Sequence, residues 1–311
     1  MEKTLMNTQS TDPDIIKERA EKLNEIFEER DNGLSVVFNS VWKNNVEKPA
    51  FTIRSDAYNA CPTIYPDEAM LELTDEELAD RLESFHDKHA RNISIDMLMD
   101  RDYILQHVRP RLVSADSNMD GITHADIAYI PWEELGLLVT FYIPVPGFDA
   151  EDGSNASCQL KWAHLQTADV AVSELYDLAI EHISREMDFK TMRETLFGMM
   201  GESFEIPIPE EADDTMFILT TKDKLYGAAL LLSDAAMQMV AERLGSQDFY
   251  ILPSSVHETI ILNASPDSPM VKDKQALVEM ITEVNDTQVD ATDRLSYNLF
   301  AHSADGLRIV A

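Results

Sequence analysis

The order of strand and helix patterns along the chain constrains its fold most. Apolar runs typical of strands occur at residues 34–38, 51–54, 127–130, 137–143, 158–165, 216–220, 249–252 and 256–262. Amphipathic helix patterns begin at residues 13, 75, 173, 234 and 269, at irregular intervals between the strands. A doubly wound parallel sheet requires a regular alternation of strand and helix, which this chain lacks. We therefore expect an α+β fold.

Several helix ends carry local signals. Asp12 followed by Pro13 is a start signal, and Asn32-Gly33 is a stop. Thr74 and Glu77 have the spacing of a capping box, in which each side chain bonds the other residue's backbone. The apolar stripe of that second helix is predicted to consist of Leu78, Leu82 and Phe85.

A segment at residues 205–214 predicts a boundary within the 311-residue chain. It combines two prolines with five acidic residues, so it cannot continue a helix or a central strand. We expect an acidic N-terminal α+β lobe at residues 1–204, a connector at 205–214, and a C-terminal α+β lobe at 215–311. Each lobe should contain a small mixed or antiparallel sheet packed with helices.

The charge balance excludes several kinds of partner. The chain has 25 Lys and Arg against 57 Asp and Glu, a net charge of −32. Such a charge repels nucleic-acid phosphates and anionic membranes, so direct binding to either is not expected. The acidic excess is a solvated surface that maintains solubility, or else a face that docks a basic partner or mimics DNA.

The remaining composition indicates a cytoplasmic protein without a cofactor. Two cysteines, Cys61 and Cys158, do not make the disulfide framework of a small secreted domain. The first twelve residues contain no apolar segment, and no later stretch approaches the roughly 20 apolar residues that span a bilayer. The ten scattered glycines form no phosphate loop or dinucleotide fingerprint.

One long motif resembles a known family. The segment from Phe249 to Leu262, FYILPSSVHETIIL, resembles the signature of an uncharacterised Firmicutes family, the domain-of-unknown-function family numbered 5688. Shorter motifs follow in the family's order, from Lys43-Asn44-Asn45 to Glu283-Val284-Asn285, so the resemblance covers residues 34 to 300. It implies a globular protein, but no reaction, cofactor or partner.

A partial calcium motif lies at residues 116–121. Asp116, Asn118 and Asp120 alternate before Gly121, as in the first half of a calcium loop. The twelfth position should be a bidentate Glu but is Ile127. Because Asn, Asp and Gly also favour tight turns, we expect a turn here and no bound metal.

A second metal candidate is the pair His86 and His89 on the helix that begins at residue 75. Spacing of three residues places both side chains on one helical face, where they could hold a divalent ion. No third ligand is supplied by the sequence. We expect an exposed polar face at the helix end instead.

The family signature contains Ser254, Ser255, His257 and Glu258, the residue types of a Ser/His/Glu hydrolase. In an extended strand, however, His257 and Glu258 point to opposite faces, and Ser255 lies about 6.6 Å from His257. A nucleophile elbow is also missing. A turn whose hydroxyls satisfy its own backbone explains the serines better.

The apolar even-numbered positions of residues 256–262 predict which face of this strand is buried. Glu258 is also an even-numbered position, so we expect its side chain on the same inward face as Val256, Ile260 and Leu262. A buried carboxylate needs a partner, and we expect that partner to be Arg294 or Lys222. His257 is then expected on the opposite side, at the surface or beneath a helix.

We expect a non-enzymatic protein that acts through protein contacts, with an acidic face as its candidate surface. The first alternative is a hydrolase or metal-dependent enzyme that uses His257 or the His86/His89 pair. The second is a calcium-binding module at Asp116–Asp120. A pocket that joins His257 to a distant acid would favour the enzyme, and an acidic face without a cleft would favour the binding protein.

Overall fold

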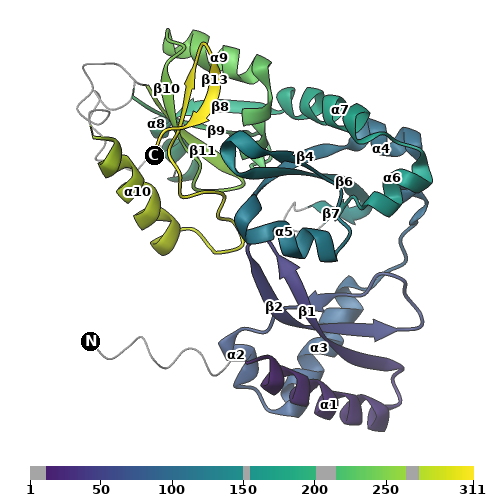
Figure 1. Ribbon diagram of the computed structural model, residues 1–311. Helices are drawn as coiled ribbons and strands as arrows, with labels where there is room; N and C mark the ends of the chain where they lie inside the picture. Colours follow the sequence, from purple (N-terminus) through teal and green to yellow (C-terminus); the bar gives the residue numbers. More distant parts are fainter. Residues whose placement is uncertain (1–11, 150–154, 201–214, 264–272) are drawn as a thin grey trace, which may run out of the picture. The chain divides into compact units, whose positions relative to one another are not determined.

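The computed structural model describes residues 12–149, 155–200, 215–263 and 273–311. Antiparallel sheets flanked by helices make up this part of the chain, so the α+β class is confirmed (Figure 1). The chain divides into two compact units, with the division between Ile95 and Asp96. This division differs from the boundary that we expected at residues 205–214, which lie outside the described residues.

Unit 1 is a three-stranded sheet, in the order β1-β2-β3, packed with helices. Its elements are α1 (Pro13–Arg30), β1 (Leu34–Lys43), β2 (Val46–Ser55), β3 (Thr63–Ile64), α2 (Glu68–Leu71) and α3 (Asp75–His89). Asn45 adopts the left-handed conformation in the turn between β1 and β2, with φ +65°, which asparagine tolerates well. Helices α1 and α3 lie on the same side of the β1–β2 hairpin (Figure 1), and their inner residues Leu23, Phe27, Leu78 and Leu82 pack with Phe51.

The predicted caps of unit 1 are confirmed. The Asp12 side chain accepts a hydrogen bond from the Asp14 amide at 2.9 Å, and both halves of the Thr74–Glu77 capping box are formed. The predicted stripe of α3 is wrong at one position. Phe85 is 39% exposed, whereas His86 is buried at 3% and continues the stripe of Leu78 and Leu82.

The first half of unit 2 is built on a second sheet, in which β6 pairs with β4, β5 and β7. Its strands are β4 (Arg109–Ser114), β5 (Tyr129–Trp132), β6 (Leu137–Asp149) and β7 (Asn155–Gln159), and its helical segments are η1 (Asp96–Leu98), α4 (Arg101–His107), α5 (Ala115–His124), η2 (Glu133–Leu135), α6 (Trp162–Ala168) and α7 (Val172–Ser184). Two predictions fail here. The expected strand at 158–165 ends at Gln159 and gives way to α6, and the expected turn at 116–121 is helical.

The second half of unit 2 is a six-stranded antiparallel sheet in the order β13-β12-β10-β11-β9-β8. Its elements are β8 (Met187–Thr191), α8 (Met192–Met200), β9 (Met216–Thr221), η4 (Gly227–Leu232), α9 (Asp234–Leu244), β10 (Phe249–Leu252), β11 (Glu258–Asn263), α10 (Lys274–Thr287), β12 (Phe300–Ser303) and β13 (Gly306–Ile309). Because β8 pairs with β9, the two sides of the expected connector contribute neighbouring strands to one sheet. The expected helix start at Ser268-Pro269 lies outside the described residues, and α10 is capped by Asp273.

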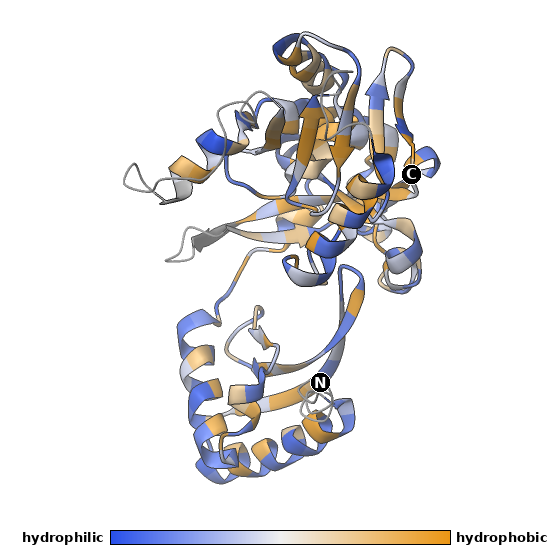
Figure 2. Ribbon diagram, turned by 90° about the vertical axis from the view of Figure 1, so that its left-hand side faces the viewer, coloured by the Kyte–Doolittle hydropathy of each residue, from blue (hydrophilic) through white to orange (hydrophobic). Residues whose placement is uncertain are grey.

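The central strands of this sheet are hydrophobic on both faces (Figure 2). Helix α10 packs Leu277 and Ile281 against Leu252 and Leu262 on one face. The other face of β11 is buried as well, because Thr259 and Ile261, which point to that face, are both 0% exposed. Within the described ranges, no helix combines the length and the apolar character that crossing a bilayer requires.

Candidate functional site

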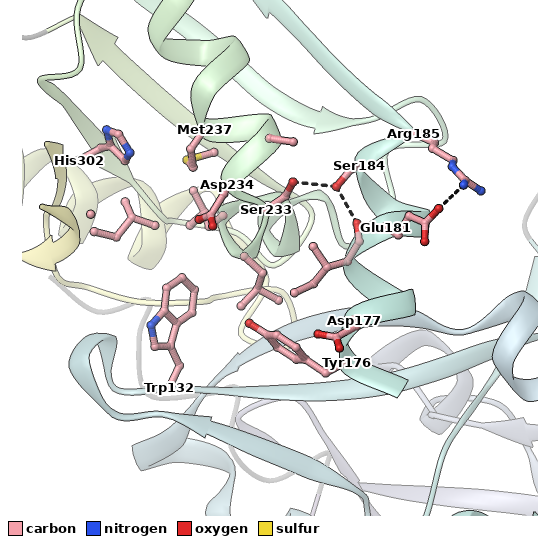
Figure 3. Close-up of a pocket in the computed structure, with 16 residues that line it drawn as sticks. Trp132, Tyr176, Asp177, Glu181, Ser184, Arg185, Ser233, Asp234, Met237 and His302 are labelled. Carbon is pink, nitrogen blue, oxygen red and sulfur yellow. Dashed lines mark hydrogen bonds and ion pairs between the residues drawn. The ribbon is translucent and has the colours of Figure 1, made fainter. Parts of the chain in front are cut away.

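A pocket of about 800 Å³ opens in unit 2 (Figure 3). Its wall comes from four places in the chain: the end of β5, helix α7, the junction of η4 with α9, and the β12–β13 hairpin. The volume falls in the range of small-molecule sites. The fold therefore brings residues that are far apart in the sequence to one concave surface.

Two aromatic rings and an apolar lining form much of this pocket. Trp132 from β5 and Tyr176 from α7 both face the pocket interior (Figure 3). Burial raises the pKa of the Tyr176 hydroxyl, and the carboxylates of Asp234 and Asp177 raise it further. The apolar lining consists of Ile180, Leu231, Leu232, Met237 and Leu307.

The charged groups of the pocket are mostly acidic. Asp177, Glu181 and Asp234 line it, and Arg185 lies among the described lining residues as well. Arg185 forms an ion pair with Glu181 one helical turn earlier. The side chains of Asp177 and Asp234 make no hydrogen bond or ion pair to any described residue. The pocket therefore has a surplus of negative charge.

Two serine hydroxyls that line the pocket have structural partners. The Ser184 and Ser233 oxygens are 2.7 Å apart, and the Ser184 hydroxyl lies 2.6 Å from the Ile180 carbonyl. Ser233 caps α9 by accepting a hydrogen bond from the Ala236 amide. The lining residue His302 directs its Nδ1 to the Gln247 carbonyl at 2.7 Å. This arrangement does not activate either serine as a nucleophile.

The family signature forms a separate cluster around His257. Nδ1 of His257 accepts a hydrogen bond from the Tyr226 amide at 3.2 Å, which leaves the ring proton on Nε2. Nε2 lies 3.4 Å from a carboxylate oxygen of Asp293. The imidazole also stacks on the Tyr226 ring, with centroids 5.2 Å apart. Both ring nitrogens are thus engaged by the protein, which supports a structural role.

The serines of the signature lie just before a bend at Val256 and His257. Ser254 and Ser255 are buried, and the Ser255 hydroxyl accepts a hydrogen bond from the His257 amide at 3.0 Å. The carbonyl of Ser254 accepts a hydrogen bond from the Leu295 amide. The Ser255 hydroxyl therefore bonds the backbone of His257, and the imidazole nitrogens have other partners.

The predicted burial of Glu258 is wrong. Glu258 is exposed on β11, and neither expected cation is bonded to it. Lys222 donates to the Arg185 carbonyl at 3.1 Å, and the Arg294 Nε donates to the Val289 carbonyl at 3.2 Å. Glu258 shares a face with Leu262, as its parity predicts, but it lies near the strand end, away from the residues that pack on α10.

Two partners of His257 were missed from the sequence. Tyr226 and Asp293 are distant from His257 along the chain, and neither belongs to a recognisable motif. A third missed residue, Gly227, donates its amide to the His257 carbonyl at 2.9 Å. A Cβ atom at Gly227 would lie 2.6 Å from that same carbonyl oxygen. The close approach requires glycine at this position.

The calcium candidates occupy a helix. Residues Ala115–His124 form α5, in which the buried Asn118 donates its amide to the Ser114 carbonyl at 2.9 Å. A calcium loop needs an irregular backbone that turns alternate side chains to one ion, so this helical geometry does not match it. Within the described ranges, no three His, Cys, Asp or Glu residues are grouped as metal ligands.

The two histidines of α3 have different surroundings. His86 is buried in an edge-to-face contact with the Tyr58 ring, and its Nε2 has no hydrogen-bond partner among the described residues. His89 is half-buried and packs against Phe85, with ring centroids 4.3 Å apart. The expected exposed polar face is therefore wrong for His86. The two rings contact different neighbours, Tyr58 and Phe85.

Residues 14–303 match the model of the family of unknown function DUF5688. The chain belongs to this family. The match confirms the resemblance carried by the Phe249–Leu262 segment, and the family description assigns no activity. Comparison with curated proteins gave no match, and comparison with solved structures gave none either.

A distinct charged surface lies on α1 of this DUF5688 member. Five exposed acids recur every three or four residues and form the acidic stripe: Asp14, Glu18, Glu21, Glu25 and Glu28. The buried residues of α1 have the same spacing on the opposite side of the helix: Ile16, Ala20, Leu23 and Phe27. In the stripe, Glu18 pairs with Lys22 at 3.0 Å. Glu21, Glu25 and Glu28 make no side-chain ion pair or hydrogen bond within the part of the chain that is described.

Proposed function

We propose that this protein is a non-enzymatic binding protein that docks a basic segment of a protein partner on the acidic stripe of α1. We place it in the cytoplasm of a bacterium, a member of the Firmicutes. The two free cysteines support a reducing compartment, and the resemblance of the Phe249–Leu262 segment to a Firmicutes family supports the origin. The single observation that carries the proposal is the acidic stripe opposite the buried stripe of α1.

The acidic stripe is unfavourable for the isolated helix. Like charges three or four residues apart each destabilise a helix by about 0.2 to 0.5 kcal/mol. Glu18 is paired with Lys22, so the repulsion is largest in the pairs Glu21–Glu25 and Glu25–Glu28. These two pairs cost about 0.4 to 1 kcal/mol, which the packing of the opposite face must offset. A cationic partner would relieve this repulsion and would associate quickly through electrostatic steering. The same charge repels nucleic acids and anionic membranes.

The geometry gives less support to the alternatives. An enzyme that uses His257 needs a free ring nitrogen, but Tyr226 and Asp293 engage both nitrogens. A calcium module at Asp116–Asp120 needs a loop where the chain forms α5.

The test compares two triple variants with equal loss of charge. Glu21→Gln/Glu25→Gln/Glu28→Gln neutralises the stripe, and Glu242→Gln/Glu279→Gln/Glu283→Gln neutralises exposed acids on α9 and α10 of unit 2. Each tagged protein is incubated with lysate of the native host, and a captured partner is purified and titrated at 50 and 200 mM salt. We expect the wild type and the unit 2 variant to bind the partner equally, with weaker binding at high salt.

The stripe variant should bind the same partner at least tenfold more weakly than the wild type. Circular dichroism of the stripe variant checks that α1 is intact. Equal binding by all three proteins, capture of no partner, or affinity independent of salt would contradict the proposal.

A further inference from the structure

We propose that the unit 2 pocket of Figure 3 binds a small alkylamine, with its ammonium group held by Trp132, Tyr176 and the carboxylates of Asp177 and Asp234. The inference concerns a different surface from the acidic stripe and does not depend on the proposed function.

The carboxylates supply the charge for this site. Asp177 and Asp234 come from different helices, α7 and α9, yet both line one pocket. Both side chains are exposed and make no hydrogen bond or ion pair with a described residue, and Arg185, which also lines the pocket, is paired with Glu181. Both carboxylates also influence the same hydroxyl, because each raises the pKa of Tyr176. The negative charge of the lining therefore favours a cation in this pocket.

The aromatic rings make an organic cation a better ligand than a metal ion. Trp132 and Tyr176 approach the pocket from separate elements, and their side chains face its interior in Figure 3. Ammonium groups bind the negative face of indole and phenol rings, and indole binds them best. A divalent metal would instead require several oxygen ligands in a regular geometry. Aromatic rings beside unpaired carboxylates are typical of sites that bind ammonium groups.

The apolar lining defines the remainder of the ligand. Ile180, Leu231, Leu232, Met237 and Leu307 offer aliphatic contacts beside the charged groups. A ligand that consists only of an ammonium group would leave these contacts unused. An amine with an aliphatic chain of several carbons would fill more of the 800 Å³ and gain from burial of the chain.

An anionic ligand is disfavoured, although the N-terminus of α9 borders the pocket. Helix N-termini attract anions through unpaired amides. Here the Ser233 hydroxyl already accepts a hydrogen bond from the Ala236 amide, and Asp234 places a carboxylate in the first turn of α9. An anion would also meet Asp177 and Glu181. The local charge therefore favours a cation at this helix end.

The experiment compares ligands of equal length and opposite charge. Hexylamine and hexanoate are titrated into the full chain carrying Trp42→Phe and Trp162→Phe, so that fluorescence reports Trp132 alone. Calorimetry on the unmodified protein gives the affinities. We expect saturable binding of hexylamine and none of hexanoate. Capped lysine peptide tests the other source of an ammonium group, and it should bind more weakly than hexylamine.

Variants then locate the site. Asp177→Asn and Asp234→Asn should each weaken hexylamine binding about three- to tenfold, and Trp132→Ala by a similar factor. Glu242→Gln removes an equal charge from α9 outside the pocket and should bind as the wild type does. The Gln variant of the acidic stripe should also bind normally, which separates this test from that of the proposed function.

Thermal melts identify any variant that fails to fold, and Trp132→Phe provides a conservative replacement at the aromatic position. Four results would overturn the inference: no hexylamine binding, equal binding of hexanoate, tighter binding of the lysine peptide, or affinity unchanged in both Asn variants.

Discussion

Replacing Gly227 by alanine should destabilise unit 2 strongly. The added Cβ would lie 2.6 Å from the His257 carbonyl oxygen and 2.6 Å from the Thr220 Cα. Both distances are about 1 Å short of ordinary contact, and both neighbours are backbone atoms that cannot rotate away. The backbone segments at Gly227, His257 and Thr220 would have to move apart to admit the Cβ atom. Such overpacking costs about 1 to 3 kcal/mol.

The same separation weakens hydrogen bonds. The His257 carbonyl accepts from the Gly227 amide at 2.9 Å and from the Thr220 hydroxyl at 2.8 Å, and each bond contributes about 1 kcal/mol. We therefore expect a total loss of about 2 to 4 kcal/mol in the free energy of unfolding. For a unit of this size, a loss of about 3 kcal/mol lowers Tm by roughly 6 to 12 °C.

Gly198→Ala is the matched control for this substitution. Gly198 lies on α8, and a Cβ atom there would meet nothing within 4 Å. Alanine should stabilise the protein at this position by about 0.5 to 1 kcal/mol. Urea denaturation followed by circular dichroism measures both variants. If Gly227→Ala unfolds at the wild-type midpoint, the close approach to His257 is not as tight as the geometry indicates.

Four further predictions follow from single features. Glu258→Ala should change the free energy of unfolding by less than about 0.5 kcal/mol, because Glu258 is exposed. A loss above about 2 kcal/mol in chemical denaturation would instead support a buried ion pair of Glu258. Limited proteolysis should cut preferentially at residues 205–214, and uniform resistance there would contradict this. Elemental analysis after dialysis should find substoichiometric calcium and zinc, and a stoichiometric ion would show a site that we have missed. Burial raises the pKa of the Cys158 thiol, so less thiolate forms at a given pH. Its alkylation by iodoacetamide should therefore be slow at pH 8 and should accelerate at a higher pH than in the denatured protein.

Features set by a few neighbouring residues could be predicted from the sequence. Asp12 and the Thr74–Glu77 box cap their helices as their spacing indicates. Ser233 and Gly245 likewise bound α9, with Gly245 in the left-handed conformation at φ +68°. These signals depend on hydrogen bonds within one helical turn, so tertiary packing rarely overrides them.

Features set by long-range packing could not be predicted. The segment at residues 116–121 has turn-forming residues, yet it forms α5, whose buried side packs Ile122 against Val113 and Leu138. A strand pattern at 158–165 likewise yields to α6 after Gln159. Local propensity is weak relative to burial of an apolar face, which depends on strands elsewhere in the chain.

The candidate site was invisible for a related reason. The four residues proposed to hold the ammonium group, Trp132, Tyr176, Asp177 and Asp234, span about a hundred positions without a shared motif. Each residue alone has an ordinary explanation as a packed ring or a solvated carboxylate. Only the fold shows that α7 and α9 place two unpaired carboxylates in the same cavity.

Glu258 shows how a correct parity can still give a wrong burial. Glu258 and Leu262 do lie on one face of β11, as alternation predicts. Burial on that face depends on the reach of α10, whose Leu277 and Ile281 pack on Leu262. Glu258 lies four residues from Leu262, beyond those contacts, and remains exposed. Parity assigns a residue to a face, and only the covering helix determines which part of that face is withdrawn from water.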